Sequence, residues 1–360
     1  MDCDEKFMRR ALELAHLAWG KTHPNPMVGA VIVKGGKIIA EGYHKKDGDL
    51  HAERNAINSL TQSPEGATIY VSLEPCSTKG RTGACTDAII ASGIKKVVIG
   101  TLDPNPAHAG KAIGILENAG IECKAGVLEK ECRDLNIIFN HFITEKNALL
   151  AIKYAQTKNG KIAEKRGVPS QITSEAARAH LMRYRALFPA IAVGFGTLLA
   201  DNPSLTIRDE SGENSNLRFI LDRNLNCAKL NLSNYKVFSD KFKDLTTVVC
   251  DLGAPRENLE FLKSKGVKIL QIKTRREEEK FFWQNLKIDI KQPAIMVEGG
   301  AKILTSIARC NAADYAFKYI AEKVFENTDA LDAFDCPAPE IKNPVLEKLP
   351  PDICIRGFLQ

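Results

Sequence analysis

The chain has 360 residues and a formal net charge of +6, with 44% hydrophobic and 26% charged residues. This composition excludes a collagen-like or wholly disordered chain, and the lack of a run of about 18 apolar residues excludes a membrane-spanning helix. The length predicts two domains, because single hydrophobic cores rarely grow beyond about 250–300 residues. The first residues, MDCDEKFMRR, contain no apolar stretch typical of a secretory signal, so we expect a cytoplasmic protein with reduced cysteines.

The first half of the chain predicts an α/β domain that ends near residue 146. The pattern of apolar residues predicts, in chain order, a helix at 4–19, a hairpin around Gly35-Gly36, a short helix from residue 51, a strand at 67–73, a helix at 85–92, a strand at 95–101, a helix at 109–119 and a strand at 121–127. Strands that alternate with helices indicate a sheet covered by helices on both faces.

The second half, residues 147–360, predicts another α/β domain with a nucleotide-sized cleft at its strand ends. Strands are expected at 149–155, 190–195, 217–222, 246–250, 267–272 and 294–299, and helices at about 174–187, 256–265 and 301–310. The segment after about residue 325 is rich in proline, and we expect it to be irregular. The first half holds 18 basic and 18 acidic residues, so the positive excess lies in the second half and favours phosphorylated small molecules.

Four residues of the first half have the spacing of a catalytic zinc site. Glu53 follows His51 by two residues, Cys76 ends a predicted strand, and Cys85 begins a predicted helix. A catalytic zinc needs three protein ligands and an open position for water, and one imidazole with two thiolates supplies the three. Glu53 would then move a proton from the water to a leaving amine.

The same order of residues is typical of zinc deaminases, which carry H-x-E followed by P-C-x-x-C. Here eight residues separate the two cysteines, and Lys79 and Arg81 lie between them, which fits a larger and more anionic substrate than a free nucleoside. Each of the four residues alone could equally be structural, but together they favour a metal centre. The other eight cysteines show no ligand spacing, and we expect them to be structural.

The motifs of this half resemble the bifunctional riboflavin-biosynthesis deaminase–reductase family. They read THPNPMVGAVIV, GYHKKDGDLHAE, LEPCSTKGRTGAC and DPNP. The resemblance implies a cytidine-deaminase-like, three-layer fold that removes the 2-amino group of a diaminopyrimidinone ribosylamino 5′-phosphate. It implies that His51, Cys76 and Cys85 bind zinc and that Glu53 is the proton shuttle. It also implies that Asn25 and His44 line the pyrimidine pocket, while Thr78 replaces a histidine of the family pattern.

The second half resembles the reductase domain of the same family, which has a dihydrofolate-reductase-like fold and uses NADPH. The matching stretches are AARAHLMRYRA, GFGTLLADNPSLTIR and VEGG. The resemblance implies substrate contacts for Arg185, Leu205, Arg208 and Glu298, and cofactor contacts for Thr197, Asp201 and Gly300. Two arginines can hold a phosphate through paired hydrogen bonds, and the glycines let the backbone approach a pyrophosphate closely.

This half also departs from the family pattern, at Thr157, Asn159, Gln171 and Arg223. We therefore consider three functions. The first is a bifunctional enzyme with a zinc deaminase domain at 1–146 and an NADPH reductase domain at 147–360, in a homo-oligomer without nucleic-acid or membrane partners. The second is a deaminase whose reductase-like domain has lost catalysis. The third, a nucleic-acid deaminase, is disfavoured by the wide cysteine gap and the lack of a basic, aromatic surface.

Overall fold

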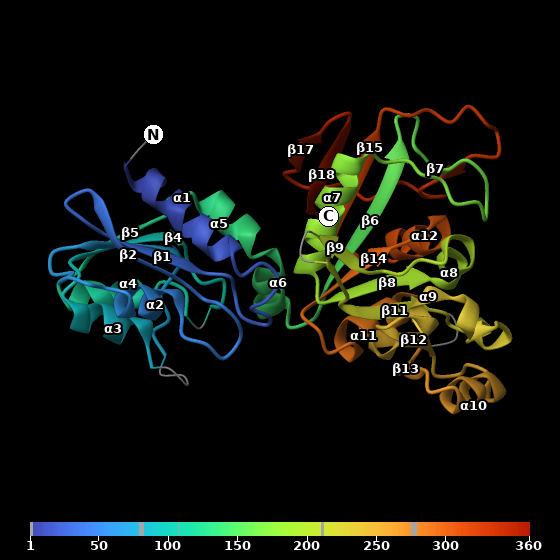
Figure 1. Ribbon diagram of the computed structural model, residues 1–360, viewed down its shortest axis with the longest axis horizontal. Helices are drawn as coiled ribbons and strands as arrows, with labels where there is room; N and C mark the ends of the chain where they lie inside the picture. The colour runs from blue at the N-terminus through green and yellow to red at the C-terminus, as the bar shows by residue number, and fades with distance from the viewer. Residues whose placement is uncertain (1–2, 79–82, 107, 210–211, 275–278) are drawn as a thin grey trace. The chain divides into compact units, whose positions relative to one another are not determined.

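The computed structural model describes residues 3–78, 83–106, 108–209, 212–274 and 279–360 (Figure 1). The chain divides into two compact units, residues 1–146 and 147–360. Across the described ranges, every helix is too short or too polar to cross a membrane. Each unit is built on its own sheet with its own buried core.

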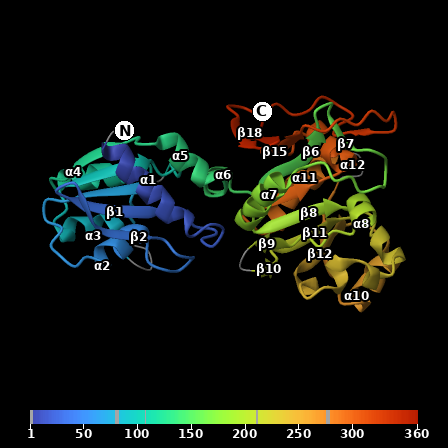
Figure 2. The same ribbon diagram turned by 45° about the horizontal axis from the view of Figure 1, so that its top comes forward.

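The first unit is a three-layer α/β/α structure. Its elements are α1 (Cys3–His16), β1 (Gly29–Lys34), β2 (Lys37–Tyr43), α2 (Ala52–Asn58), β3 (Thr68–Leu73), α3 (Cys85–Ser92), β4 (Lys96–Thr101), α4 (Lys111–Asn118), β5 (Glu122–Ala125), α5 (Glu129–Leu135) and α6 (Ile137–Glu145). The sheet has the order β2-β1-β3-β4-β5, in which β3, β4 and β5 run parallel. Helices α1 and α5 cover one face, and α2, α3 and α4 cover the other (Figures 1 and 2).

Close packing places α2 against this sheet. Gly42 on β2 lies so near to α2 that an added Cβ would collide with the backbone of Ala52 and Ala56. A side chain here would push the helix away from the sheet. Since His51 directly precedes α2 and Glu53 lies in its first turn, Gly42 helps to set the depth of both residues.

The second unit is built on a nine-stranded sheet of order β13-β12-β11-β8-β14-β6-β15-β18-β17. Its strands and helices are β6 (Leu149–Thr157), β7 (Lys161–Ala163), α7 (Glu175–Leu187), β8 (Ala190–Gly194), α8 (Phe195–Asp201), β9 (Ile207–Asp209), β10 (Gly212–Asn214), β11 (Leu217–Leu221), α9 (Lys236–Ser239), β12 (Thr246–Asp251), α10 (Arg256–Ser264), β13 (Lys268–Ile272), α11 (Glu279–Asp289), β14 (Ala294–Glu298), α12 (Ala301–Arg309), β15 (Tyr315–Ala321), β16 (Leu331–Asp332), β17 (Val345–Leu349) and β18 (Asp352–Phe358). The seven strands from β13 to β15 run parallel.

The chain leaves β8 and β14 in opposite directions, which creates a crevice between them. Core residues next to α8 and α10 lie on one face of the sheet, and those next to α11 and α12 lie on the other. Strand β8 is followed by α8 and its neighbour β14 by α12, so their connections diverge. Open α/β sheets bind their ligands at such a switch point, outside the carboxyl ends of the strands.

The prediction of an irregular C-terminal segment was wrong for its last part. Strands β17 and β18 form an antiparallel hairpin that extends the large sheet beyond β15. In the stretch DICIRGF of β18, Asp352, Cys354 and Arg356 are buried, while Ile353 and Ile355 are partly exposed. This two-residue alternation is typical of a strand, but the prolines around it obscured the pattern.

Candidate functional site

Three side chains of the first unit meet near the carboxyl end of β3. His51 precedes α2, Cys76 follows β3, and Cys85 is the first residue of α3. The Nδ1 atom of His51 lies 3.4 Å from Sγ of Cys76 and 3.4 Å from Sγ of Cys85. The backbone N–H of Cys85 donates to Cys76 Sγ at 3.3 Å. The fold thus gathers the three residues with metal-ligand spacing into one cluster.

This set of donor atoms fits a zinc ion. Tetrahedral coordination with Zn–N of about 2.0–2.1 Å and Zn–S of about 2.3 Å places nitrogen and sulfur ligands roughly 3.6 Å apart. The 3.4 Å separations within the cluster are close to that value. Hydrogen bonds from Cys85 and His51 lower the pKa of the Cys76 thiol, and the thiolate is the form that binds metal.

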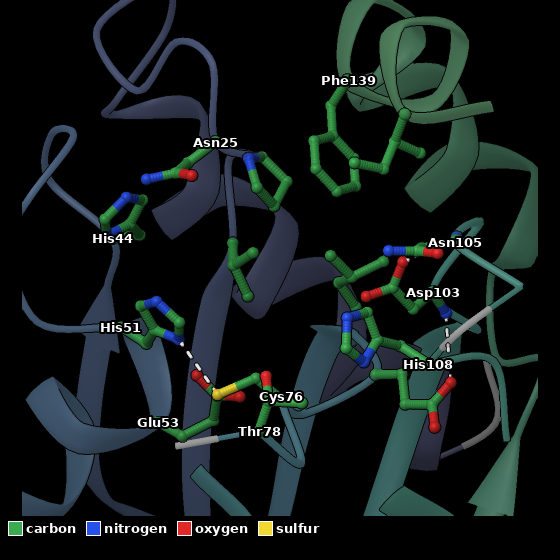
Figure 3. Close-up of a pocket in the computed structure, with 15 residues that line it drawn as sticks. Asn25, His44, His51, Glu53, Cys76, Thr78, Asp103, Asn105, His108 and Phe139 are labelled. Atoms are coloured by element: carbon green, nitrogen blue, oxygen red, sulfur yellow. Dashed lines mark hydrogen bonds between the residues drawn. The ribbon is translucent and has the colours of Figure 1, made fainter. Parts of the chain in front are cut away.

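Glu53 lies beside the cluster and is only 3% exposed. Burial raises its pKa to about 7, and the charge of Cys76 adds to this effect. A carboxyl group that titrates near neutrality can both accept and release a proton. Figure 3 shows Glu53, His51 and Cys76 together at the floor of a cavity of about 240 Å³.

Asn25 and His44 lie on one wall of this cavity (Figure 3). The Nδ1 atom of His44 lies 3.1 Å from the carbonyl oxygen of Leu50, which assigns the proton to Nδ1 and makes Nε2 an acceptor. That Nε2 atom is buried and meets no hydrogen-bond partner among the described residues. The Asn25 amide donates to Asp47 at 2.9 Å, so its oxygen is the group that can accept from a ligand.

The opposite wall consists of residues to which the sequence patterns assigned no role. Asp103, Asn105 and His108 follow β4, and Phe139 lies on α6 (Figure 3). Because β3 and β4 are parallel neighbours, the segments after both strands open at the same edge of the sheet. The DPNP motif was the one signal in the sequence that could have pointed to Asp103 and Asn105.

In the second unit, Arg185 and Glu298 form a buried ion pair. Arg185 donates from Nε and Nη2 to the two carboxylate oxygens of Glu298 at 2.6 and 2.8 Å, and from Nη1 to the carbonyl of Thr206 at 2.9 Å. Burial lowers the pKa of nearby Lys153 on β6, and the charge of Glu298 opposes this shift. Lys153 was not among the predicted site residues, although a lysine inside the apolar stretch LLAIKYA was a visible signal.

Thr197 and Gly300 meet at the crevice between β8 and β14. Thr197 is in the first turn of α8, and Gly300 directly precedes α12. A Cβ atom on Gly300 would lie 3.5 Å from the Thr197 hydroxyl, so the two loops are in contact. Asp201 ends α8, where the charge of Lys153 acts on its carboxyl group. The structure thus brings the predicted cofactor residues and Lys153 into one region.

Leu205 and Arg208 belong to the segment that follows α8. Leu205 is 2% exposed and has a left-handed backbone with φ of 55°, which a leucine adopts only under tight packing. The next residue, Thr206, is the one whose carbonyl binds Arg185. Arg208 is exposed on β9 opposite Glu213 of β10.

A second group with metal-ligand chemistry consists of His180, Glu347 and Cys354. His180 Nε2 lies 2.6 Å from Glu347, and its Nδ1 lies 2.9 Å from the hydroxyl of Tyr319. Arg356 donates to the same carboxylate of Glu347 at 3.2 Å. Both ring nitrogens are thus engaged and a cation already neutralises the carboxylate, so this group is a hydrogen-bonded network of the fold.

Comparisons with known proteins agree with both units. Residues 1–101 match the model of the cytidine and deoxycytidylate deaminase zinc-binding region, and residues 148–339 match the RibD C-terminal domain. Riboflavin biosynthesis protein RibD of Aquifex aeolicus is 43% identical over 90% of this chain and 88% of its own. The chain belongs to the RibD family. Riboflavin biosynthesis protein RibD of Actinobacillus pleuropneumoniae is 39% identical over 89% of this chain and 84% of its own.

Solved RibD structures extend the agreement to the whole chain. Acinetobacter baumannii RibD has a TM-score of 0.80 at 30% identity and covers 99% of both chains. A Thermotoga maritima deaminase/reductase has a TM-score of 0.80 at 36% identity and covers 98% of both. The protein is therefore a bifunctional deaminase–reductase of riboflavin biosynthesis with zinc and NADPH as cofactors. A deaminase with a degenerate second domain is not favoured.

Within this chain, the departures from the family pattern have local partners. Thr157 donates to Asn159 at 2.6 Å, and Asn159 donates to the carbonyl of Phe325 at 2.8 Å. Arg223 pairs with Asp251 at 2.8 Å. The carbonyl of Gln171 accepts from Lys323 at 2.7 Å. In the first unit Thr78 lines the cavity, whereas Lys79 and Arg81 lie outside the described residues.

Proposed function

We propose that residues 1–146 are the zinc-dependent deaminase domain and residues 147–360 the NADPH-dependent reductase domain. The first domain deaminates 2,5-diamino-6-ribosylamino-4(3H)-pyrimidinone 5′-phosphate, and the second reduces the ribosyl group of the product to a ribityl chain. The Thermotoga maritima relative, which is named for these two reactions and matches both units, supports this assignment.

His51, Cys76 and Cys85 hold the zinc ion of the deaminase. When bound, zinc supplies a Lewis acid that makes a water molecule nucleophilic near neutral pH. Glu53 accepts the proton of that water and passes it to the leaving ammonia, a role supported by its burial next to the cluster. Asn25 and His44 bind the pyrimidine, and the orphaned Nε2 of His44 accepts a hydrogen bond from a substrate N–H group.

Arg185, Leu205, Arg208 and Glu298 bind the ribosyl substrate of the reductase. The buried Arg185–Glu298 pair is aligned to hold polar groups of the sugar. Arg208 follows Thr206, the residue whose carbonyl binds Arg185, by two positions, and its exposed side chain can bind the phosphate. Lys153 lies opposite Glu298 in the pairing of β6 with β14, and we infer that it supplies the proton that the sugar takes up together with the hydride.

Thr197, Asp201 and Gly300 bind NADPH at the crevice between β8 and β14. Backbone N–H groups at the starts of α8 and α12, next to glycines that let the cofactor approach, are suited to its pyrophosphate. A Cβ on Gly194 would lie 2.6 Å from Ile303, which shows how closely β8 packs against α12 here.

The protein is proposed to be a cytoplasmic homo-oligomer. Free cysteine thiols that serve as ligands are typical of a compartment that keeps thiols reduced, which supports this location. Strand β17 is at the edge of the large sheet, and its Leu346 is 56% exposed, which supports pairing with a second copy. Light scattering on the purified protein measures the number of chains directly.

The observation that carries the proposal is the convergence of His51, Cys76 and Cys85 beside buried Glu53. Its test is an assay on the diaminopyrimidinone substrate, with and without NADPH, that follows ammonia and cofactor separately. We expect ammonia release without NADPH, and NADPH oxidation only after deamination. Oxidation that fails with the deaminated substrate at saturating NADPH would leave a deaminase alone.

A further inference from the structure

Glu74 is a buried carboxylate that the proposed mechanism does not use. It lies between β3 and the ligand Cys76 and is 5% exposed. Its Oε2 atom accepts from the backbone N–H of Asp103 at 3.1 Å and of Gly110 at 2.9 Å, and its Oε1 atom accepts from Ala112 at 3.0 Å. A single side chain thus receives three backbone N–H groups from the segment that follows β4.

These three N–H groups belong to the segment that forms the opposite wall of the cavity. They lie at the start, at the end and just beyond the connection between β4 and α4, which carries Asp103, Asn105 and His108. In Figure 3 these three side chains lie across the cavity from His51 and Glu53. The backbone N–H of Glu74 also donates to the carbonyl of Thr101 at 2.9 Å, so Glu74 binds the last residue of β4 as well as the segment that follows it.

We propose that Glu74 is a positioning residue of the deaminase, holding the wall of Asp103, Asn105 and His108 at a set distance from the zinc ligands. This inference rests on the proposed function of the cluster. Only Pro75 separates Glu74 from Cys76, so the segment that places the metal also places the wall. Substrate that binds against the wall is therefore aligned with the reacting water.

The chemistry of the side chain explains why a glutamate is needed here. A carboxylate is acceptor-only and its two oxygens can receive three N–H donors, whereas a glutamine turns an NH₂ group toward at least one of them. Aspartate keeps the charge but is one methylene shorter, so it cannot reach all three donors. Glu74→Gln removes the charge next to Cys76, whereas Glu74→Asp keeps that charge and shortens the side chain. Comparing the two variants therefore shows whether the position of the wall or the charge matters.

The test compares Glu74→Gln and Glu74→Asp in the full chain with Glu117→Gln as the control. Glu117 is exposed on α4, so this control makes the same chemical change in the adjoining element. The readouts are KM and kcat of deamination, zinc content, and reductase activity with deaminated substrate. Because the reductase belongs to the other compact unit, its activity serves as an internal reference for the amount of chain, and zinc content reports on the deaminase unit itself.

We expect both Glu74 variants to raise the deaminase KM about tenfold, the effect of losing one charge-assisted hydrogen bond. Zinc content and reductase activity stay at the wild-type level, kcat falls less than KM rises, and the control is unchanged. Amide exchange supplies a second measurement: the segment 102–112 exchanges faster in Glu74→Gln, while β3 does not. This measurement stays informative if deamination is too weak to assay.

Unchanged KM and unchanged exchange in both variants would overturn the proposal. So would a Glu74→Asp protein that behaves as wild type while Glu74→Gln loses zinc, because the charge beside Cys76 would then be the important property. A wild-type chain that binds no zinc and releases no ammonia would instead refute the proposed function itself.

Discussion

Replacing Glu53 by glutamine separates proton transfer from every other role of the deaminase site. Gln has the same shape as Glu but cannot take up and release a proton, and Glu53 is 3% exposed at the floor of the cavity. Positioned general acid–base groups contribute about 10²- to 10⁴-fold to a rate, which is about 3–5 kcal/mol of barrier. Since Gln buries no charge, Glu53→Gln should not lower the free energy of unfolding.

The assay measures ammonia release under single-turnover conditions, together with zinc content and thermal unfolding of the same preparation. We expect a rate reduced by about 10²-fold or more, unchanged zinc, and a reductase that still oxidises NADPH with deaminated substrate. Ammonia release within threefold of wild type would refute the role of Glu53. Loss of zinc in parallel with the rate would show that Glu53 supports the metal cluster rather than moving a proton.

Three further changes test other parts of the molecule. Cys85→Ser should remove zinc and deamination but leave the reductase active; metal analysis that still finds full zinc would contradict the ligand assignment. Gly194→Ala brings a Cβ within 2.6 Å of Ile303, so it should weaken NADPH binding, as titration calorimetry measures, without changing deamination. Burial raises the pKa of Glu347, but hydrogen bonds from His180 and Arg356 outweigh burial and lower this pKa to about 2. The Glu347 carboxylate therefore stabilises the fold above pH 4.5, and this stabilisation is lost as the pH falls toward 2. Glu347→Gln should therefore cost up to about 3 kcal/mol at pH 7 and flatten acid unfolding between pH 4.5 and 2, as measured by denaturant titration.

The metal cluster was open to prediction because its ligands follow local rules. His51, Cys76 and Cys85 lie at a helix start, a strand end and another helix start, and each position can be read from hydrophobic periodicity. The wall of Asp103 and Asn105 could not be found in this way. Its place beside the cluster depends on the parallel pairing of β3 with β4, which no local pattern states.

The ion pair of Arg185 and Glu298 in the second unit also depends on a contact between distant parts of the sequence, which local patterns do not predict. Arg185 and Glu298 are 113 positions apart, and they meet because β14 lies between β8 and β6 in the sheet. Motifs marked both residues as candidates, but neither motif indicates that one neutralises the other. The hairpin β17–β18 was missed for a different reason, since its alternation lies between prolines that usually interrupt strands.

We predict that the departures of the second unit from the family pattern affect cofactor affinity more than hydride transfer. Thr157 and Asn159 bind each other and reach Phe325, so the altered turn after β6 is closed by its own hydrogen bonds. Arg223 pairs with Asp251 at 2.8 Å and lies 3.8 Å from Glu279, so its positive charge has acidic partners. The hydrogen bonds described for these departures do not involve Arg185 or Glu298, which are held by each other and by the carbonyl of Thr206. We therefore predict a reductase that still transfers hydride but has a raised KM for NADPH, as NADPH oxidation with the deaminated substrate measures. No oxidation at saturating NADPH by a folded chain with a working deaminase would refute this prediction.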